Sequence, residues 1–150
     1  MRLSAAPFLV LCLASCRPVS IAEAEAPPAA IQWTLATMPW RPGPPTLPHG
    51  ARVAVLEGSP SAEGLFTMRL ELPAGSRIAP HTHPRPERVT VISGRVAVRF
   101  GTDDSPGSAN TFGAGDYYVN PPNVPHAVEF PESSVVQITG EGPWELRMLD

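Results

Sequence analysis

The chain has 150 residues, of which 43% are hydrophobic and only 17% are charged. This length suits one domain with its own core, and a formal net charge of -3 argues against the clustered basic face that nucleic-acid binding needs. With 20 prolines and 12 glycines, the composition predicts short strands joined by turns and excludes a fold built on long helices.

The first residues have the features of an export signal. Arg2 precedes an apolar run from Ala5 to Ala14, which is too short to span a bilayer. The run ends in the residues LASC, which resemble the lipobox of bacterial lipoproteins, where the signal is cut before the cysteine and the thiol is acylated. The sequence therefore predicts a lipoprotein-type signal peptide at 1–15, lipidation of Cys16 and a tether at 16–30.

The predicted lipid anchor has consequences for localisation and for redox chemistry. It would hold an exported protein at the bacterial envelope, in the periplasm or at the outer membrane, with membrane contact through the lipid only. An ordinary secretory signal, cut after Ala24 or Ala26, is the alternative. Because Cys12 and Cys16 are the only cysteines, cleavage before Cys16 leaves no pair for an intramolecular disulfide.

Residues 31–150 are predicted to form one all-β domain. Apolar and polar side chains alternate over 66–72, 95–100 and 144–148, which is typical of strands with one buried face. Several such strands in a small chain favour an antiparallel sandwich or barrel. Residues 38–50 are interpreted as a proline-rich loop without assignable chemistry, and residues 101–113 as a polar loop.

Three of the four histidines can converge on one point. His81 and His83 are two residues apart on an extended segment and so face the same side, and a proline-broken step can return Glu87 beside them. If the strand that begins near His126 lies alongside, the site has three imidazole nitrogens and one carboxylate oxygen. That donor set suits a divalent transition metal, such as Fe, Mn, Ni, Cu or Zn. His49, in the proline-rich loop, is expected to be solvated.

Two segments resemble the paired motifs of the cupin superfamily. The run from Gly75 to Gly94 matches the first motif in full, with the two neighbouring histidines and the glutamate at its ligand positions. The run from Gly115 to Phe130 matches the second motif, except that Asn123 stands where the family has glycine and Phe130 where it has asparagine. Asparagine tolerates the left-handed turn that glycine would supply, so the first departure is mild.

The resemblance implies a cupin-type jelly-roll antiparallel β-barrel, here a small single-domain cupin. It implies that His81, His83, Glu87 and His126 hold one metal ion near the mouth of the barrel. It also implies a homodimer that pairs edge strands, and residues 134–140 are a candidate edge.

The predicted function is that of an exported metal-binding cupin, an oxygenase-like enzyme acting on a small oxygen-rich molecule. A non-catalytic envelope lipoprotein that binds a metal or a small ligand is the alternative, and a regulatory or scaffolding domain is a third interpretation. Arg77 and Arg85 flank the histidine pair, where they would attract an anionic substrate or lie solvated at the surface. Five residues are candidates for the barrel lining, although each is also expected in a plain core: Phe66, Met68, Tyr118, Val128 and Phe130.

Overall fold

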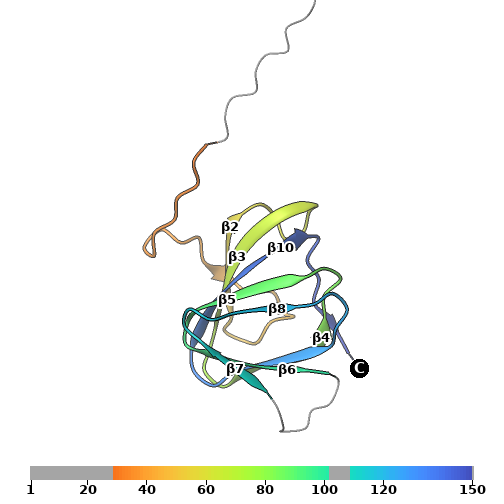
Figure 1. The fold of residues 1–150 in the computed structure, drawn as a ribbon. Coiled ribbons are helices and arrows are strands. Elements are labelled where there is room, and N and C mark those ends of the chain that lie inside the picture. The colour runs from red at the N-terminus through yellow and green to blue at the C-terminus, as the bar shows by residue number, and fades with distance from the viewer. Residues whose placement is uncertain (1–28, 102–108, 150) are drawn as a thin grey trace, which may run out of the picture. The chain divides into compact units, whose positions relative to one another are not determined.

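The computed structural model describes residues 29–101 and 109–149. All regular elements in these residues are strands, arranged in two antiparallel sheets (Figure 1). The predicted signal peptide, Cys16 and most of the tether lie outside the described residues. Within the described part, no helix has the length and hydropathy needed to cross a membrane.

The larger sheet has six strands in the order β1-β2-β3-β10-β5-β8. Their bounds, in sheet order, are Arg41–Pro42, Arg52–Glu57, Gly64–Leu72, Ser134–Gly142, Glu87–Ser93 and Tyr117–Asn120. The smaller sheet has five strands in the order β11-β4-β9-β6-β7. Their bounds are Arg147–Met148, Ser76–Thr82, His126–Phe130, Arg95–Phe100 and Asn110–Gly113.

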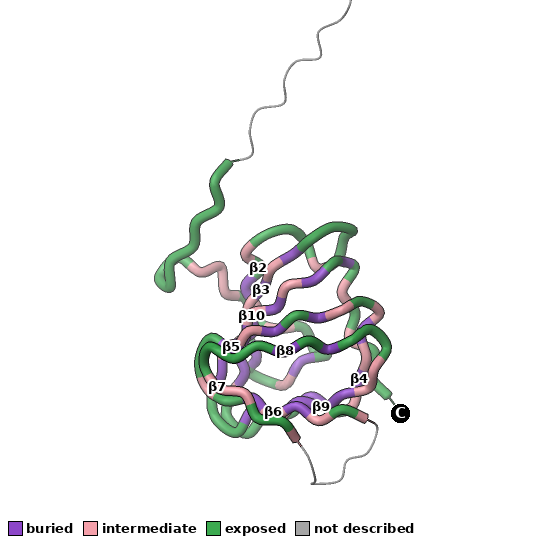
Figure 2. Tube along the Cα trace, in the orientation of Figure 1, coloured by how far each residue is buried: buried purple, intermediate pink, exposed green. Residues whose placement is uncertain are grey.

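The core lies between the two sheets, as the alternating patterns predict. Side chains of β3 at even positions from Phe66 to Leu72 are buried, while those between them are half-buried. Val96 and Val98 of β6 face the same core from the smaller sheet, and Figure 2 shows the buried positions on the facing strands. The all-β jelly-roll prediction is thus confirmed, in the form of a sandwich rather than a closed barrel.

Three sequence interpretations need correction. Residues 134–140 are not an edge, because β10 pairs with β3 on one side and β5 on the other. The strand expected over 144–148 is reduced to Arg147–Met148, although Trp144 and Leu146 still pack against the core. The polar loop ends early, because residues 110–113 form β7 against β6.

Two turns show why the motif glycine and asparagine positions are constrained. Gly94 has a φ of 78°, and a Cβ there would overlap Ser133 O and Ser134 Oγ. Asn123 has a φ of 59°, the left-handed conformation in which asparagine replaces glycine. Its backbone N–H donates to His83 O at 2.8 Å, so this turn ties the two motifs together.

Candidate metal centre

The pairing of β4 with β9 brings two histidines face to face. His81 is the register partner of His126, and Ile78 is the partner of Val128. The register shifts between Ile78 and His81, because β4 advances three residues where β9 advances two. Such a bulge changes which face the following side chains occupy. Ile78 and His81 are consequently both buried, despite their odd separation.

His83 and Glu87 enter the same region from the end of β4 and the start of β5. His83 follows the last residue of β4, and the proline-containing bend at 84–86 leads to Glu87. Glu87, Val89 and Val91 are buried on one face of β5, as their shared parity predicts. The bend therefore returns the carboxylate to the histidine pair.

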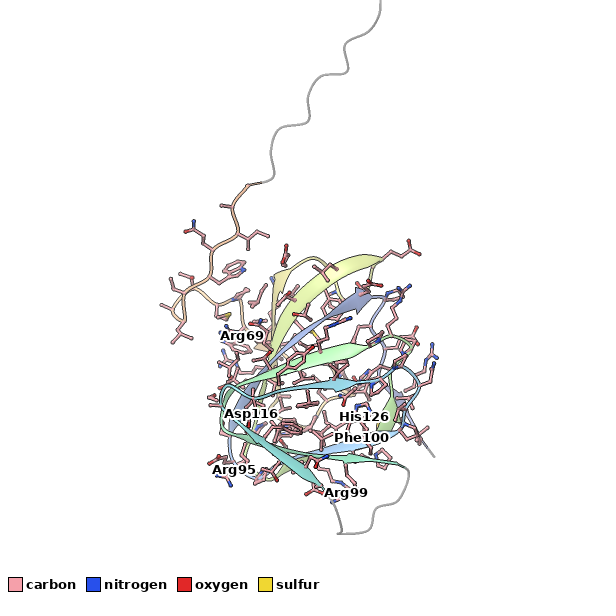
Figure 3. All side chains as sticks on the ribbon, viewed as in Figure 1. Arg69, Arg95, Arg99, Phe100, Asp116 and His126 are labelled. Atoms are coloured by element: carbon pink, nitrogen blue, oxygen red, sulfur yellow. The ribbon has the colours of Figure 1, made fainter. Side chains whose placement is uncertain are left out.

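The three imidazoles form one compact, buried cluster. One ring nitrogen from each of His81, His83 and His126 lies within 4.8 Å of the other two. The ring centroids are 4.2 to 5.1 Å apart, and the three residues are at most 2% exposed. In Figure 3, His126 lies beside Phe100 of the neighbouring strand β6, and these two rings are 6.0 Å apart. The rings are close enough for a single ion to contact all three.

The backbone sets the tautomer of each ring. Each Nδ1 lies within hydrogen-bond distance of a carbonyl oxygen: His81 of Ala79 at 2.8 Å, His83 of Glu145 at 2.7 Å and His126 of Val124 at 3.0 Å. A carbonyl oxygen can only accept, so each Nδ1 carries the hydrogen and donates it. In the neutral ring, Nε2 is then left with its lone pair free to bind a cation.

Two of these Nε2 atoms make no hydrogen bond to a described residue, although that of His83 lies 3.4 Å from Glu87 Oε2. Among the described residues, His83 Nε2 and His126 Nε2 are buried without a hydrogen bond. A buried polar atom without a partner costs about 1–3 kcal/mol. A metal ion bound by both atoms would offset that cost, and three imidazole nitrogens are a set that first-row divalent ions favour. The site therefore fits a divalent transition metal.

Glu87 lies beside the cluster and is held by hydrogen bonds. Its Oε2 accepts from Asn120 Nδ2 at 2.7 Å and lies 3.4 Å from His83 Nε2. Its Oε1 accepts from Trp144 Nε1 at 3.0 Å, and the indole stacks on His83 with 5.3 Å between ring centroids. The group of ring nitrogens within 4.8 Å does not include this carboxylate. The two oxygens of Glu87 therefore lie next to the histidine cluster and already accept hydrogen bonds from Asn120 and Trp144.

The protonation equilibria differ among the three histidines. Burial lowers the pKa of His81 to about 4 and also lowers the pKa of His126. Burial acts in the same direction on His83, but the close contact with the negatively charged Glu87 carboxylate outweighs it and raises the pKa of His83. Burial opposes ionisation of Glu87, yet its contacts with His83 and Asn120 hold the pKa of that carboxyl below its usual value. At neutral pH, His81 and His126 are therefore neutral and able to bind a cation.

The chamber next to the cluster is small. Its volume is about 30 Å³, which is room for about one water molecule, and its wall includes His81, His83 and Glu87. Tyr118, Val128 and Phe130 also contribute to this wall, as three of the five predicted lining residues. Burial raises the pKa of Tyr118, so its phenol stays protonated.

The other predicted positions lie elsewhere. Met68 borders a separate, larger cavity, and Phe66 is fully buried in the core. Arg77 and Arg85 are exposed, near Glu129 at 3.9 Å and Glu141 at 3.1 Å. His49 is exposed, as expected.

Sequence reasoning missed two residues of the site, Asn120 and Trp144. Asn120 shares the parity of buried Tyr118 on β8, a signal that could have placed it inward. Trp144 was expected to face the core, but its hydrogen bond to Glu87 joins residues far apart in sequence. No local pattern encodes a contact of that kind.

Comparisons with known proteins agree with this fold. Residues 29–145 match the family model described as the ChrR cupin-like domain. A candidate acetylacetone dioxygenase from Methylibium petroleiphilum PM1 is 26% identical, with a TM-score of 0.63 over 81% of this chain and 84% of that one. No curated protein matches the chain.

Two further solved structures share the fold. An acetylacetone dioxygenase from Acinetobacter johnsonii is 23% identical, with a TM-score of 0.60 over 89% of this chain and 84% of that one. An RmlC-like cupin from Shewanella frigidimarina NCIMB 400 is 17% identical, with a TM-score of 0.57 over 73% of this chain and 87% of that one.

Proposed function

Because the chain belongs to the ChrR cupin-like domain family, we propose that it is a mononuclear metalloenzyme whose His81, His83 and His126 hold one divalent transition-metal ion. We propose further that it carries out an oxygenase-type reaction on a small oxygen-rich molecule. The Methylibium relative supports this class, since acetylacetone is a small molecule that chelates a metal through two oxygens.

One observation carries the proposal. Among the described residues, the Nε2 atoms of His83 and His126 are buried without a hydrogen bond, and one ring nitrogen of each lies within 4.8 Å of a ring nitrogen of His81. Their Nδ1 atoms are already committed to carbonyls, so Nε2 is the nitrogen of each ring that is left for a cation, and the His83 ring must be neutral to use it. Two buried ring nitrogens without a hydrogen bond, side by side, are uncommon in a purely structural polar network and support a bound cation.

The bound ion would supply a Lewis-acid centre that polarises substrate oxygens and, if it is iron, takes part in chemistry with dioxygen. The protein's own part is to orient the rings and to exclude water. Three carbonyls hold the imidazoles, and apolar residues such as Val128 and Phe130 close the chamber. An ion held by these three nitrogens would keep coordination positions available for substrate.

Glu87 is proposed as the fourth ligand, a role that requires a change in its present hydrogen bonds. Its Oε2 is 3.4 Å from His83 Nε2, close to the separation of two neighbouring ligands on one ion. Asn120 and Trp144 hold the carboxylate by hydrogen bonds to its two oxygens. To bind the ion, the carboxylate must therefore move from this position toward the ring nitrogens. We therefore expect the three imidazoles to provide most of the affinity.

The location of the protein in the cell is a further part of the proposal. The apolar run at 5–14 and the LASC sequence support export and acylation at Cys16, which would keep the domain at the bacterial envelope. The partner there would be a small-molecule substrate, with the membrane contacted through the lipid alone. A homodimer remains a prediction from the cupin resemblance.

The test combines metal loading with oxygen consumption. Purified apo-protein is given one equivalent of Fe(II), Mn(II) or Zn(II) under anaerobic conditions, and oxygen uptake is then followed with acetylacetone, phenols and dicarboxylates. We expect stoichiometric metal binding by the wild type and by His49→Asn, and loss of binding in His126→Asn. Coupled loss of oxygen and of one substrate in the iron form would support the enzyme.

A receptor without turnover is the second candidate, and the cavity walls favour it. The wall of the small chamber offers, besides the proposed ligands, one titratable residue, Tyr118, whose pKa burial raises. Stoichiometric metal binding with unchanged oxygen and substrate would support the receptor and contradict the enzyme. If His126→Asn kept its metal and its activity, the result would contradict both the enzyme and the receptor.

A further inference from the structure

A second cavity lies next to the metal chamber and is far larger. Its volume is about 730 Å³, within the range of cavities that hold drug-sized ligands. It opens at the edge of the sandwich where β1 and β2 of the larger sheet meet the segment leading to β11. Its wall is mainly apolar and includes Trp33, Val53, Met68, Leu70, Trp144 and Leu146. It therefore offers space that the 30 Å³ chamber lacks.

Four side chains line both cavities: Leu47, Leu70, Trp144 and Leu146. Trp144 and Leu146 are therefore part of the partition between the outer cavity and the chamber whose wall includes His81 and His83. Trp144 stacks on His83 and donates to Glu87, so the partition is attached directly to the metal site. Leu146 follows in a segment without regular strand structure, between β10 and β11. A molecule in the outer cavity is thus one side chain away from the histidine cluster.

Arg41 gives the outer cavity its polarity. It is the one charged residue on the described wall, and it is exposed. Within the described residues it has no ion-pair partner, whereas the nearby Arg52 is bound to Glu71 Oε2 at 2.8 Å. A guanidinium without an acidic partner, next to an apolar surface, attracts a carboxylate and can bind it with two hydrogen bonds.

We propose that the outer cavity binds the apolar body of a substrate that carries a carboxylate, that Arg41 binds this carboxylate, and that the reacting end passes Trp144 and Leu146 to reach the histidines. This inference rests on the proposed function for the last step only. The cavity and its arginine do not depend on a metal. The substrate class is therefore an amphipathic acid with an aromatic or branched aliphatic body, larger than the metal chamber could hold.

The first experiment compares two matched probes by calorimetry. The purified protein, both zinc-loaded and treated with chelator, is titrated with 2-naphthoate and with its neutral counterpart 2-naphthamide. We expect the wild type to bind the acid about tenfold more tightly than the amide, because only the acid pairs with a guanidinium. Arg41→Gln should remove this preference, and Val53→Phe, which fills the cavity, should weaken both probes.

Arg95→Gln is the control, since Arg95 is an exposed arginine next to Glu132 and does not line the cavity. It should keep the tenfold preference. Equal binding of the two probes by the wild type, a preference that persists in Arg41→Gln, or no binding of either probe would overturn the inference. Naphthoate binding by a protein that takes up no metal would instead overturn the proposed function and leave the cavity assignment in place.

A second readout tests proximity to the histidines. In protein loaded with Mn(II), the proton signals of bound 2-naphthoate should broaden strongly relative to the zinc form, and Arg41→Gln should reduce this broadening. Tight binding of 2-naphthoate without any broadening by stoichiometric Mn(II) would contradict the path past Trp144.

Discussion

At the scale of single residues, the candidate site depends on hydrogen bonds that leave one nitrogen free. Each imidazole donates through Nδ1 to a backbone carbonyl, and two of those carbonyls, of Ala79 and Val124, lie two residues before the histidine that they orient. Ring orientation is therefore set locally by the main chain. Substitutions of the side chains at 79 and 124 leave this hydrogen bond in place, because the carbonyl belongs to every residue.

The role of Glu87 can be measured directly. Glu87→Gln keeps the size of the side chain but removes its charge, and it replaces one of the two acceptor oxygens with an NH2 donor. Because three imidazole ligands remain, we expect the metal-to-protein ratio to stay near one while the affinity falls roughly ten- to a hundredfold. Metal content by elemental analysis and competition with a chelator would show this.

His126→Asn is the reference for Glu87→Gln, since it removes one of the clustered ring nitrogens. If Glu87→Gln lost as much metal as His126→Asn, the three imidazoles would be insufficient, and the carboxylate would be as important as a ring nitrogen. If the affinity were unchanged, Glu87 would be no ligand at all.

The pKa shifts predict how the apo-protein responds to acid. The pKa of His81 is lowered from 6.5 to about 4, so between these values the unfolded chain binds a proton that the folded chain does not. His126 shifts in the same direction. The free energy of unfolding should therefore fall as the pH falls through this window, with His81 contributing about 3 kcal/mol.

His83 affects the free energy of unfolding in the opposite direction and in a higher pH range. The pKa of His83 is raised, so its stabilising contribution is complete below 6.5 and is lost as the pH rises above that value. Urea unfolding with a chelator present, from pH 7 to pH 4.5, would test the prediction. His81→Asn should flatten the dependence, while His49→Asn, at an exposed position, should not. Equal stability of the wild type at both pH values would contradict it.

At the scale of elements, the turn between β5 and β6 is the most constrained part of the first motif. Gly94 has a positive φ and no room for a Cβ, whereas Gly75 has a φ of 74° with nothing within 4 Å of its Cβ position. We expect Gly94→Ala to lower the free energy of unfolding by roughly 2–4 kcal/mol, and Gly75→Ala by about 1 kcal/mol. Similar losses in the two variants, measured by denaturant unfolding, would show that the contact with Ser133 and Ser134 relaxes freely.

Much of this element structure could be predicted from sequence, because burial follows the period of the side chains. The alternation of β3 and β6 is sufficient to place their core faces, and the spacing of His81 and His83 is sufficient to put both inside. The bulge in β4 was beyond that reasoning, since strict alternation would place Ile78 and His81 on opposite faces. The central position of β10 was also missed, because polarity alone does not say which strands pair.

The partners of Glu87 show the same limit within the site. The ligand types and their spacing are local properties, and the sequence contains them in two short motifs. The hydrogen bonds from Asn120 and Trp144 join β8 and the segment after β10 to β5, so they exist only once the sandwich has closed. Such contacts follow from the packing of the sheets and not from any window of sequence.

At the scale of the whole molecule, the anchoring prediction remains to be tested, because Cys16 lies outside the described residues. Expressed from its full sequence in a bacterial host, the wild type should incorporate labelled palmitate and fractionate with membranes. Cys16→Ser should lose both properties, whereas Cys12→Ser should keep them, since Cys12 lies inside the predicted signal. A mature N-terminus after Ala24 or Ala26, found by mass spectrometry, would contradict acylation.

The hydrogen bond from His83 Nδ1 to Glu145 O has a consequence for the timing of maturation. Residue 145 must be synthesised and the sandwich must close before this ring acquires its orientation, and β11 must then pair with β4 beside His81. A chain that crosses a membrane unfolded would reach the other side before its ligands are arranged. Its ion would then come from the supply in the compartment where folding finishes, and a leaderless version made in the cytoplasm would acquire whichever metal is abundant there.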